Sequence, residues 1–252
     1  DAKPPGRAGE PREDAAMIRP FDPREVLFLI PAFNEEGNLG AVLDELHREF
    51  PAATLLVIDD GSTDRTAAVA RAHGAIVVTL PFNMGIGAAI QTGIAYALAE
   101  GFHWVLRLDG DGQHDPSDIH RFFDHLRRQP ADLLIGSRFL SRAGFQSSWL
   151  RRLAIGFLCR LIRTLTGFRV TDATSGFHLY SHRAMQRLCR LYPDDYPEPE
   201  VIIMLYKWKM CVDEVPVTMR ERSAGMSSIT FLRSGYYMVK VTLAILIDMI
   251  RY

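Results

Sequence analysis

From residue 25 onward, short apolar runs alternate with amphipathic stretches along the chain. The apolar runs are too short for helices and rich in β-branched or large side chains, which is typical of buried strands. They occupy residues 26–30, 55–58, 76–80, 104–108 and 133–135. The stretches between them, at residues 39–50, 63–72, 86–99 and 115–128, carry apolar residues at helical spacing. This alternation predicts βαβ units, and therefore an α/β fold whose mostly parallel sheet has helices on both faces.

Composition and charge narrow this picture without changing it. The chain has 252 residues, 48% hydrophobic and 23% charged, so it can bury the core of one large α/β domain. The net charge of −1 gives no reason to expect a nucleic-acid partner. The three cysteines are far apart and odd in number, which favours reduced thiols in a cytosolic protein.

The two ends of the chain differ from its middle. Residues 1–20 are rich in proline, glycine and charge, and we expect a disordered tail there and not a signal peptide. No segment reaches the ~18 uncharged apolar residues of a membrane span. Residues 236–250 are apolar around most of a helix, which would lie on a bilayer, dock on a small membrane-protein partner or pack on the domain body. We therefore divide the chain into a tail (1–20), a main domain (21–232) and a C-terminal apolar helix (233–252).

Polar clusters follow all five predicted strands directly. In open α/β sheets, ligands sit beyond the carboxyl ends of the strands. The clusters are Pro31-Ala32-Phe33-Asn34-Glu35-Glu36, Asp59-Asp60-Gly61-Ser62-Thr63-Asp64, Asn83-Met84-Gly85-Ile86-Gly87, Asp109-Gly110-Asp111-Gly112-Gln113 and Gly136-Ser137-Arg138. Packing alone rarely gives five such strand ends, so we predict a ligand site along this edge.

The fourth cluster has the chemistry of a site for a hard cation. Asp109 and Asp111, one residue apart at a strand end, can both reach Mg²⁺ or Mn²⁺, which prefer oxygen ligands and often share substrate phosphates. Gln113 could add an amide oxygen or orient a water. Such a metal would neutralise charge on a departing diphosphate. The alternative is a solvated acidic turn, which the position after a buried strand disfavours.

The first three clusters suit a nucleotide. Asp59 and Asp60 can accept hydrogen bonds from a nucleobase or ribose, whereas Ser62 or Thr63 can cap the next helix. Asn34 is another candidate cap, and Glu35 a candidate contact to the nucleoside. The third cluster lacks the third glycine of a dinucleotide fingerprint, so its glycines favour close passage of the backbone past the ligand.

Taken in order, these motifs resemble those of the family 2 glycosyltransferases of the GT-A fold, over residues 26–229. Asp109-Gly110-Asp111-Gly112-Gln113-His114 and Ser175-Gly176-Phe177 look most like the dolichyl- and polyprenyl-phosphate hexose synthases. The resemblance implies inversion at the anomeric carbon of a nucleotide-diphosphate sugar, with UDP favoured over GDP, and a metal at Asp109, Asp111 and Gln113. It implies donor contacts from Pro31, Ala32, Asn34, Glu35, Asp59, Asp60, Asn83, Gly85, Asp109, Gly110 and Asp111.

An acceptor phosphate is already an anionic nucleophile and needs arginines for positioning, whereas a sugar hydroxyl needs a general base. Arg138 follows the fifth strand. Residues 149–168 form a helix with one apolar face and with Arg152, Arg160 and Arg163 on another, which suits a membrane interface or, alternatively, a core helix with a solvated basic face. In the related synthases two arginines grip the acceptor phosphate, and the resemblance implies this role for Arg138 and Arg152.

For a hydroxyl acceptor, Glu198 or Glu200 is the candidate base. Two prolines flank Glu198 and stiffen its loop, although Glu200 could simply begin a helix through Trp208. The resemblance further implies a mobile segment in which Arg222 stabilises the diphosphate or acceptor phosphate and Ser227 contacts the acceptor. Ser175 is the fourth acceptor-binding candidate.

The leading functional prediction is transfer of a hexose or N-acetylhexosamine to polyprenyl phosphate, by an enzyme that is cytoplasmic and peripheral on the inner face of the cell membrane. The runner-up transfers the sugar to a saccharide hydroxyl in surface-polysaccharide assembly. An alternative of another class is a non-catalytic sugar-nucleotide-binding subunit of a membrane complex.

Overall fold

The computed structural model describes residues 21–141, 149–194, 197–220 and 231–251. Within them, seven strands form one sheet in the order β3-β2-β1-β4-β6-β5-β7. Their bounds are β1 (Val26–Ala32), β2 (Thr54–Asp59), β3 (Ile76–Thr79), β4 (Trp104–Arg107), β5 (Leu133–Ser137), β6 (His178–Ser181) and β7 (Val212–Pro216). The five predicted strands are all present, as β1 to β5. The tail expected at residues 1–20 lies outside the described residues.

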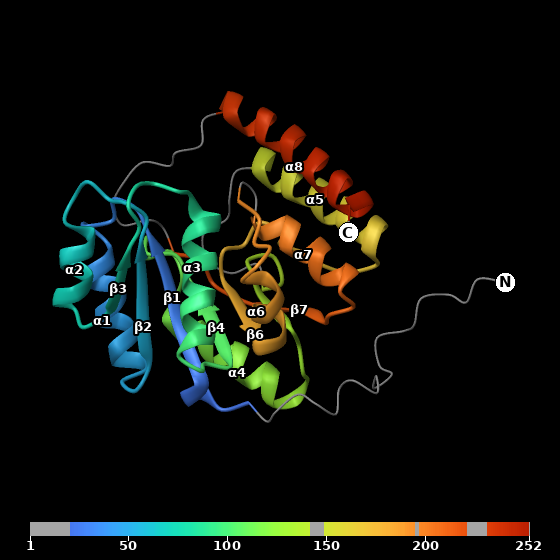
Figure 1. Ribbon diagram of the computed structural model, residues 1–252. Helices are drawn as coiled ribbons and strands as arrows, with labels where there is room; N and C mark the ends of the chain where they lie inside the picture. The colour runs from blue at the N-terminus through green and yellow to red at the C-terminus, as the bar shows by residue number, and fades with distance from the viewer. Residues whose placement is uncertain (1–20, 142–148, 195–196, 221–230, 252) are drawn as a thin grey trace.

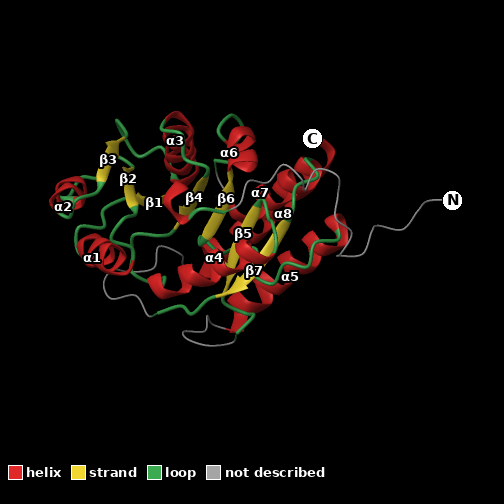
Figure 2. Cartoon of the chain, turned by 90° about the horizontal axis from the view of Figure 1, so that it is seen from below, coloured by secondary structure: helices red, strands yellow, loops and turns green. Residues whose placement is uncertain are grey.

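The helices of the described chain cover both faces of this sheet, as the view along it in Figure 2 shows. Their bounds are α1 (Leu39–Glu49), α2 (Thr66–Ala72), α3 (Ile86–Ala99), α4 (Ile119–Arg128), α5 (Trp149–Thr166), α6 (His182–Leu188), α7 (Pro197–Lys207) and α8 (Phe231–Arg251). Helices α1 and α4 lie on one face, and α3 and α6 on the other. The prediction of an α/β fold with helices on both faces is therefore confirmed.

The alternation of side chains along β1 explains why both faces are covered. Leu27 and Leu29 are fully buried in one apolar cluster, which includes residues of α3, α6 and α7. Phe28 and Ile30 point the other way, into a second cluster with residues of α1 and α4. A strand that is apolar on both faces suits the centre of an α/β sheet, and β1 lies between two neighbours to which it is parallel.

Strands β6 and β7 are two further strands that the hydrophobic pattern did not predict. Strand β6 is antiparallel to both β4 and β5, and β7 is parallel to β5. Because β6 runs against its neighbours, its amino end lies at the edge where the other strands have their carboxyl ends. The segment that precedes β6, including Ser175 and Gly176, is therefore brought to the predicted ligand edge.

The residues at the starts of α1 and α2 are not the caps that the sequence suggested. Helix α1 begins at Leu39 with Asn38 at the cap position, so Asn34 is not its cap. Helix α2 begins at Thr66, not at residue 63, and the carboxylate of Asp64 accepts the Thr66 amide hydrogen at 2.9 Å. Ser62 and Thr63 therefore lie in the turn before the helix.

Helices α5 and α8 lie side by side against α7 at one end of the molecule (Figure 1). The apolar residues expected on one face of α5 are divided: Leu158 and Ile162 are buried, whereas Leu153 and Phe157 are 62% and 53% exposed. Val241 of α8 is fully buried in the core. No helix in the described ranges has the length and apolar character to cross a membrane.

Candidate active site

Hydrogen bonds connect the turn after β1 to the turn after β2. The Asn34 side-chain oxygen accepts the Thr63 amide hydrogen at 2.9 Å, and the Asn34 amide donates to the Ser62 hydroxyl at 3.0 Å. Asn34 has a φ of 54°, in the left-handed region that asparagine tolerates better than most residues. The Glu35 amide donates to Thr66 at 2.8 Å. Two of the predicted donor-binding segments are thus built as one unit.

Asp60 fixes the turn after β3 in the same way. Its carboxylate accepts the amide hydrogens of Met84 and Gly85 at 2.7 and 2.9 Å. Gly85 has a φ of 94°, which a side chain would make costly. Asp59, at the end of β2, accepts the Ser62 amide hydrogen at 3.1 Å. Both aspartates are buried, and Asp60 contacts the Gly85 backbone, while the donor-binding role of these residues stays a prediction.

Asp109 and Asp111 follow β4 at the centre of the same edge. Burial opposes ionisation of Asp109, but the hydrogen bond from His114 at 3.4 Å and the charge of Arg107 together lower the pKa of Asp109 below its ordinary value. Asp111 accepts the Gln113 amide hydrogen at 3.1 Å. The Gln113 side-chain nitrogen donates to the Arg220 carbonyl at 3.4 Å, so its oxygen is the atom left to serve a cation.

These residues suit a cation that is shared with a substrate. Within the described residues, no group of three or more histidine, cysteine, aspartate or glutamate side chains could hold a metal ion. Mg²⁺ and Mn²⁺ commonly take one or two carboxylates and complete their coordination with substrate phosphates and water. An ionised Asp109, with Asp111 two residues away, fits that arrangement.

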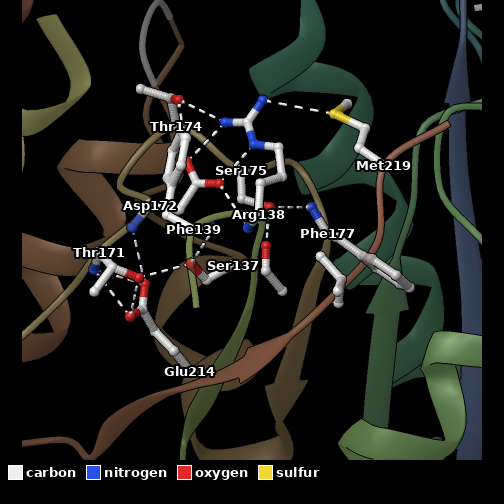
Figure 3. A network of polar contacts seen from close by, with 12 residues as sticks. Ser137, Arg138, Phe139, Thr171, Asp172, Thr174, Ser175, Phe177, Glu214 and Met219 are labelled. Carbon is white, nitrogen blue, oxygen red and sulfur yellow. Dashed lines mark hydrogen bonds and ion pairs between the residues drawn. The ribbon is translucent and has the colours of Figure 1, made fainter. Parts of the chain in front are cut away.

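Arg138, which follows β5, is held by a buried carboxylate from another segment (Figure 3). Its Nε and Nη2 donate to the two oxygens of Asp172 at 2.6 and 2.7 Å, and Nη2 also donates to Thr174 at 2.9 Å. Burial disfavours the charge of Arg138, but the bonds to Asp172 raise the pKa of Arg138 above its ordinary value. Nη1 lies 3.8 Å from the sulfur of Met219, a weak acceptor, so of the three guanidinium nitrogens it has the weakest protein partner.

Asp172 is in turn held by β7. The amide nitrogens of Thr171 and Asp172 donate to the carboxylate of Glu214 at 2.8 and 3.0 Å. Ser175, predicted to contact the acceptor, is buried and donates its hydroxyl to the Gly136 carbonyl at 2.7 Å. This contact ties residues 171–175 to β5 and leaves the expected acceptor role of Ser175 as a prediction.

Glu198 lies in the first turn of α7 and not in a stiffened loop, because prolines are tolerated at the start of a helix. Its carboxylate accepts a hydrogen bond from the Nη2 of Arg107 at 2.8 Å. Glu200 belongs to the same turn, and the helix ends at Lys207. Burial disfavours the charge of Arg107, yet the carboxylate of Glu198 raises the pKa of Arg107 well above its ordinary value.

Arg222 and Ser227 lie outside the described residues, so their roles stay predictions. Arg152 is exposed on the first turn of α5.

Sequence reasoning missed Arg107, Asp172 and Glu214. A signal existed for Arg107, which is the charged residue in an otherwise apolar strand and therefore had to find a buried partner. The sequence gave no comparable indication that Asp172 pairs with Arg138, or that Glu214 holds Asp172.

The sheet order, the carboxylates after β4 and the buried arginine after β5 together define a glycosyltransferase of the GT-A fold. The chain belongs to glycosyl transferase family 2, whose family model matches residues 28–189.

Relatives of similar length support this assignment. The polyprenol monophosphomannose synthase of Mycolicibacterium smegmatis is 30% identical, and the alignment covers 86% of this chain and 85% of that protein. The undecaprenyl-phosphate mannosyltransferase of Micrococcus luteus is 29% identical over 86% of this chain and 92% of that protein. An uncharacterised protein of Methanocaldococcus jannaschii, MJ1222, is 30% identical over 89% of this chain and 93% of its own length.

Among solved structures, glucosyl-3-phosphoglycerate synthase from Mycobacterium tuberculosis, in complex with Mn²⁺, UDP-glucose and phosphoglyceric acid, shares the fold. The TM-score is 0.69 at 22% identity, over 89% of this chain and 79% of that chain.

Proposed function

We propose that the protein transfers a hexose or N-acetylhexosamine from a nucleotide-diphosphate sugar to polyprenyl phosphate, with inversion at the anomeric carbon. An oxygen of the acceptor phosphate attacks the anomeric carbon from the face opposite the diphosphate. The bond from that carbon to the diphosphate breaks, and the nucleoside diphosphate leaves. A divalent cation, when bound, would neutralise the leaving diphosphate.

The roles of the residues follow from their places along the edge. Asp109, Asp111 and Gln113 are proposed to hold the cation together with the diphosphate. The two connected turns after β1 and β2, with Asp59 and Asp60, are proposed to contact the nucleoside. UDP is proposed over GDP only because the resemblance to the family implies it. Arg222 and Ser227 are proposed to close over the donor and acceptor.

The observation that best supports a phosphate acceptor is the fixed orientation of Arg138. Asp172 takes its Nε and Nη2, and so fixes the direction of the guanidinium and leaves Nη1 for a ligand. A pre-oriented arginine suits a phosphate, which needs positioning but no base. The candidate base Glu198 is already hydrogen-bonded to Arg107, which makes a hydroxyl acceptor less favoured. Two of the relatives are a polyprenol monophosphomannose synthase and an undecaprenyl-phosphate mannosyltransferase, whose names refer to polyprenyl-type acceptors.

A radiolabelled-sugar transfer assay tests this proposal. It uses a panel of UDP- and GDP-sugars, Mn²⁺ or Mg²⁺, and polyprenyl phosphate in detergent. We expect metal-dependent label in the organic phase, and we expect Asp111→Ala to lower it by about 10²–10³-fold, the scale of losing one charge-stabilising group. Asp124→Ala is the control, because Asp124 is exposed on α4 and pairs with Arg127.

The outcomes separate the alternatives. Label that appears only in a saccharide, with none in the lipid, would contradict the phosphate acceptor and move the base role to Glu198 or Glu200. Label in neither product, with every donor and metal, would contradict the proposed activity itself.

We also propose that the protein binds the inner face of the cell membrane through α5 and α8. On α5, Leu153 and Phe157 are exposed beside Arg152, Arg160 and Arg163. The neighbouring α8 exposes Val239, Leu243, Leu246 and Ile247. Exposed apolar side chains next to arginines are suited to the boundary of an anionic bilayer.

Sedimentation with lipid vesicles tests this surface. Each arginine near an anionic surface contributes about 1 kcal/mol, so R160Q/R163Q is expected to weaken binding to phosphatidylglycerol vesicles by about tenfold or more. R127Q/R128Q, on exposed positions of α4, is the control and should leave binding unchanged. Equal binding by both double variants would contradict the proposal; a small membrane-protein partner that covers α8 would then be the remaining reason for its exposed apolar residues.

A further inference from the structure

Arg107 is a fully buried cation in the middle of the sheet, directly before the metal-binding candidates. Its side chain is 2% exposed, and its Nη2 donates to Glu198 at 2.8 Å. The same nitrogen lies 3.7 Å from the Oδ1 of Asp109. Among the described residues, Nε and Nη1 of Arg107 have no hydrogen-bond partner. A buried charge is costly unless it is paired, so these two carboxylates are what keeps this arginine in the core.

The contact between Arg107 and Glu198 is built by the fold and not by local sequence. The two residues are 91 positions apart, and α7 delivers Glu198 to β4. The start of a helix also favours an acidic side chain, because the amide groups there carry partial positive charge. The Glu198 side chain is 16% exposed, so the pair is largely screened from water.

The surroundings leave Arg107 little freedom to move elsewhere. A side chain at Gly176 would meet the Oδ2 of Asp109 at 2.8 Å and the Nη2 of Arg107 at 3.2 Å, so the backbone packs directly on both. Two buried tyrosines, Tyr180 and Tyr192, also lie close enough for the charge of Arg107 to act on their hydroxyls, which are 3.0 Å apart. The guanidinium therefore has two carboxylates in reach and is surrounded by buried neighbours.

We propose that Glu198 is a positioning residue: its ion pair with Arg107 neutralises that arginine and so leaves Asp109 available to a divalent cation. With Glu198 in place, the shorter contact of Arg107 is to Glu198. Without it, the nearest carboxylate is Asp109, and Arg107 would compete with the cation for that side chain. The proposal rests on the proposed function only in taking Asp109 as a cation ligand, and it assigns Glu198 a role other than that of a base.

Direct measurement of Mn²⁺ binding tests the idea without any transfer assay. Free Mn²⁺ is followed by electron paramagnetic resonance as protein is added, with UDP, with GDP and with neither. We expect Glu198→Gln to raise the Kd for Mn²⁺ by about tenfold, which corresponds to ~1.4 kcal/mol. Glu49→Gln, at an exposed position on α1 that pairs with His120, is the matched control and should bind as the wild type does.

A double variant separates positioning from a general structural effect. R107M/E198Q removes both charges while keeping side chains of similar length, so Asp109 no longer faces an unbalanced arginine. We expect its Kd for Mn²⁺ to return to within about threefold of wild type, because the competitor of the cation is gone. Thermal melts of all variants show whether each is folded, and the double variant serves where Glu198→Gln alone is unstable.

Three results would overturn the proposal. Wild-type affinity in Glu198→Gln, with loss of transfer alone, would assign Glu198 to the chemical step as a base. Weak Mn²⁺ binding in R107M/E198Q, as weak as in the single variant, would show that Glu198 acts without Arg107. If wild-type protein shows no Mn²⁺ binding that depends on Asp111, the proposed cation site and this inference are both wrong. Transfer of sugar to the lipid in that case would still support the proposed activity.

Discussion

The two halves of the ligand edge hold their polar side chains in different ways. In the half formed by β1, β2 and β3, aspartates accept hydrogen bonds from backbone amides of nearby turns, as Asp60 does from Met84 and Gly85. In the half formed by β4 and β5, buried arginines are paired with carboxylates that other elements supply. Arg107 meets Glu198 from α7, and Arg138 meets Asp172 from the segment before β6.

This difference has an energetic consequence. Removing a carboxylate that binds backbone amides leaves neutral N–H groups unsatisfied, which lowers the free energy of unfolding by about 1–3 kcal/mol. A buried arginine that loses its partner becomes an uncompensated charge, and breaking such a pair typically costs about 3–5 kcal/mol. The β1–β3 half should therefore tolerate substitution of its acids better than the β4–β5 half, although both face the same ligand.

The largest expected effect is that of Asp172→Ala. The substitution leaves Arg138 buried and without its bidentate partner, so the free energy of unfolding should fall by about 3–5 kcal/mol. Asp60→Ala, which leaves the Met84 and Gly85 amides unpaired, should cost about 1–3 kcal/mol. Urea unfolding followed by circular dichroism measures both.

A matched control and a local probe sharpen this result. Asp124→Ala removes an exposed partner of Arg127 and should change stability by less than about 1 kcal/mol. Amide hydrogen exchange should rise in residues 83–85 for Asp60→Ala, since those amides lose their acceptor. If Asp60→Ala proves as costly as Asp172→Ala, the contrast between the two halves is wrong.

The same contrast explains which parts of the site could be predicted from the sequence. The β1–β3 half could be anticipated because its strands, turns and acids are contiguous in the chain. Asp59 and Asp60 end a strand and reach turns only a few residues or one helix away. Even there, Asn34 was a candidate cap, whereas Asn38 occupies the cap position of α1 and Asn34 binds the turn after β2.

The β4–β5 half could be anticipated only in part. Asp109, Asp111 and Arg138 were recognisable as strand-end groups. Their partners were not, because a short antiparallel strand, β6, brings residues 171–177 to the edge, and four residues give little periodicity to detect. The partner of Arg107 lies 91 residues away, a distance over which no spacing rule applies.

The smallest expected effect concerns pH, and it uses two neighbouring acids of β7 with shifts of opposite sign. Burial, with a smaller contribution from Asp172, raises the pKa of Glu214 even though it accepts hydrogen bonds from Thr171. Burial also opposes ionisation of Asp213, but the hydrogen bonds from His125 and from the Glu214 amide outweigh it and lower the pKa of Asp213.

The signs follow from proton binding in the folded and unfolded states. Folded protein holds the Glu214 proton more tightly, so wild type should lose stability relative to Glu214→Gln as pH rises above the ordinary value of about 4.3. Folded protein holds the Asp213 proton less tightly, so the advantage of wild type over Asp213→Asn should be present above pH ~4 and fade as pH falls. Denaturant unfolding between pH 3.5 and 7 measures both differences. If the stability difference from wild type varies with pH in the same way for both variants, the opposite pKa shifts of Glu214 and Asp213 are contradicted. The hydrogen bonds from Thr171 would then offset the effect of burial on Glu214.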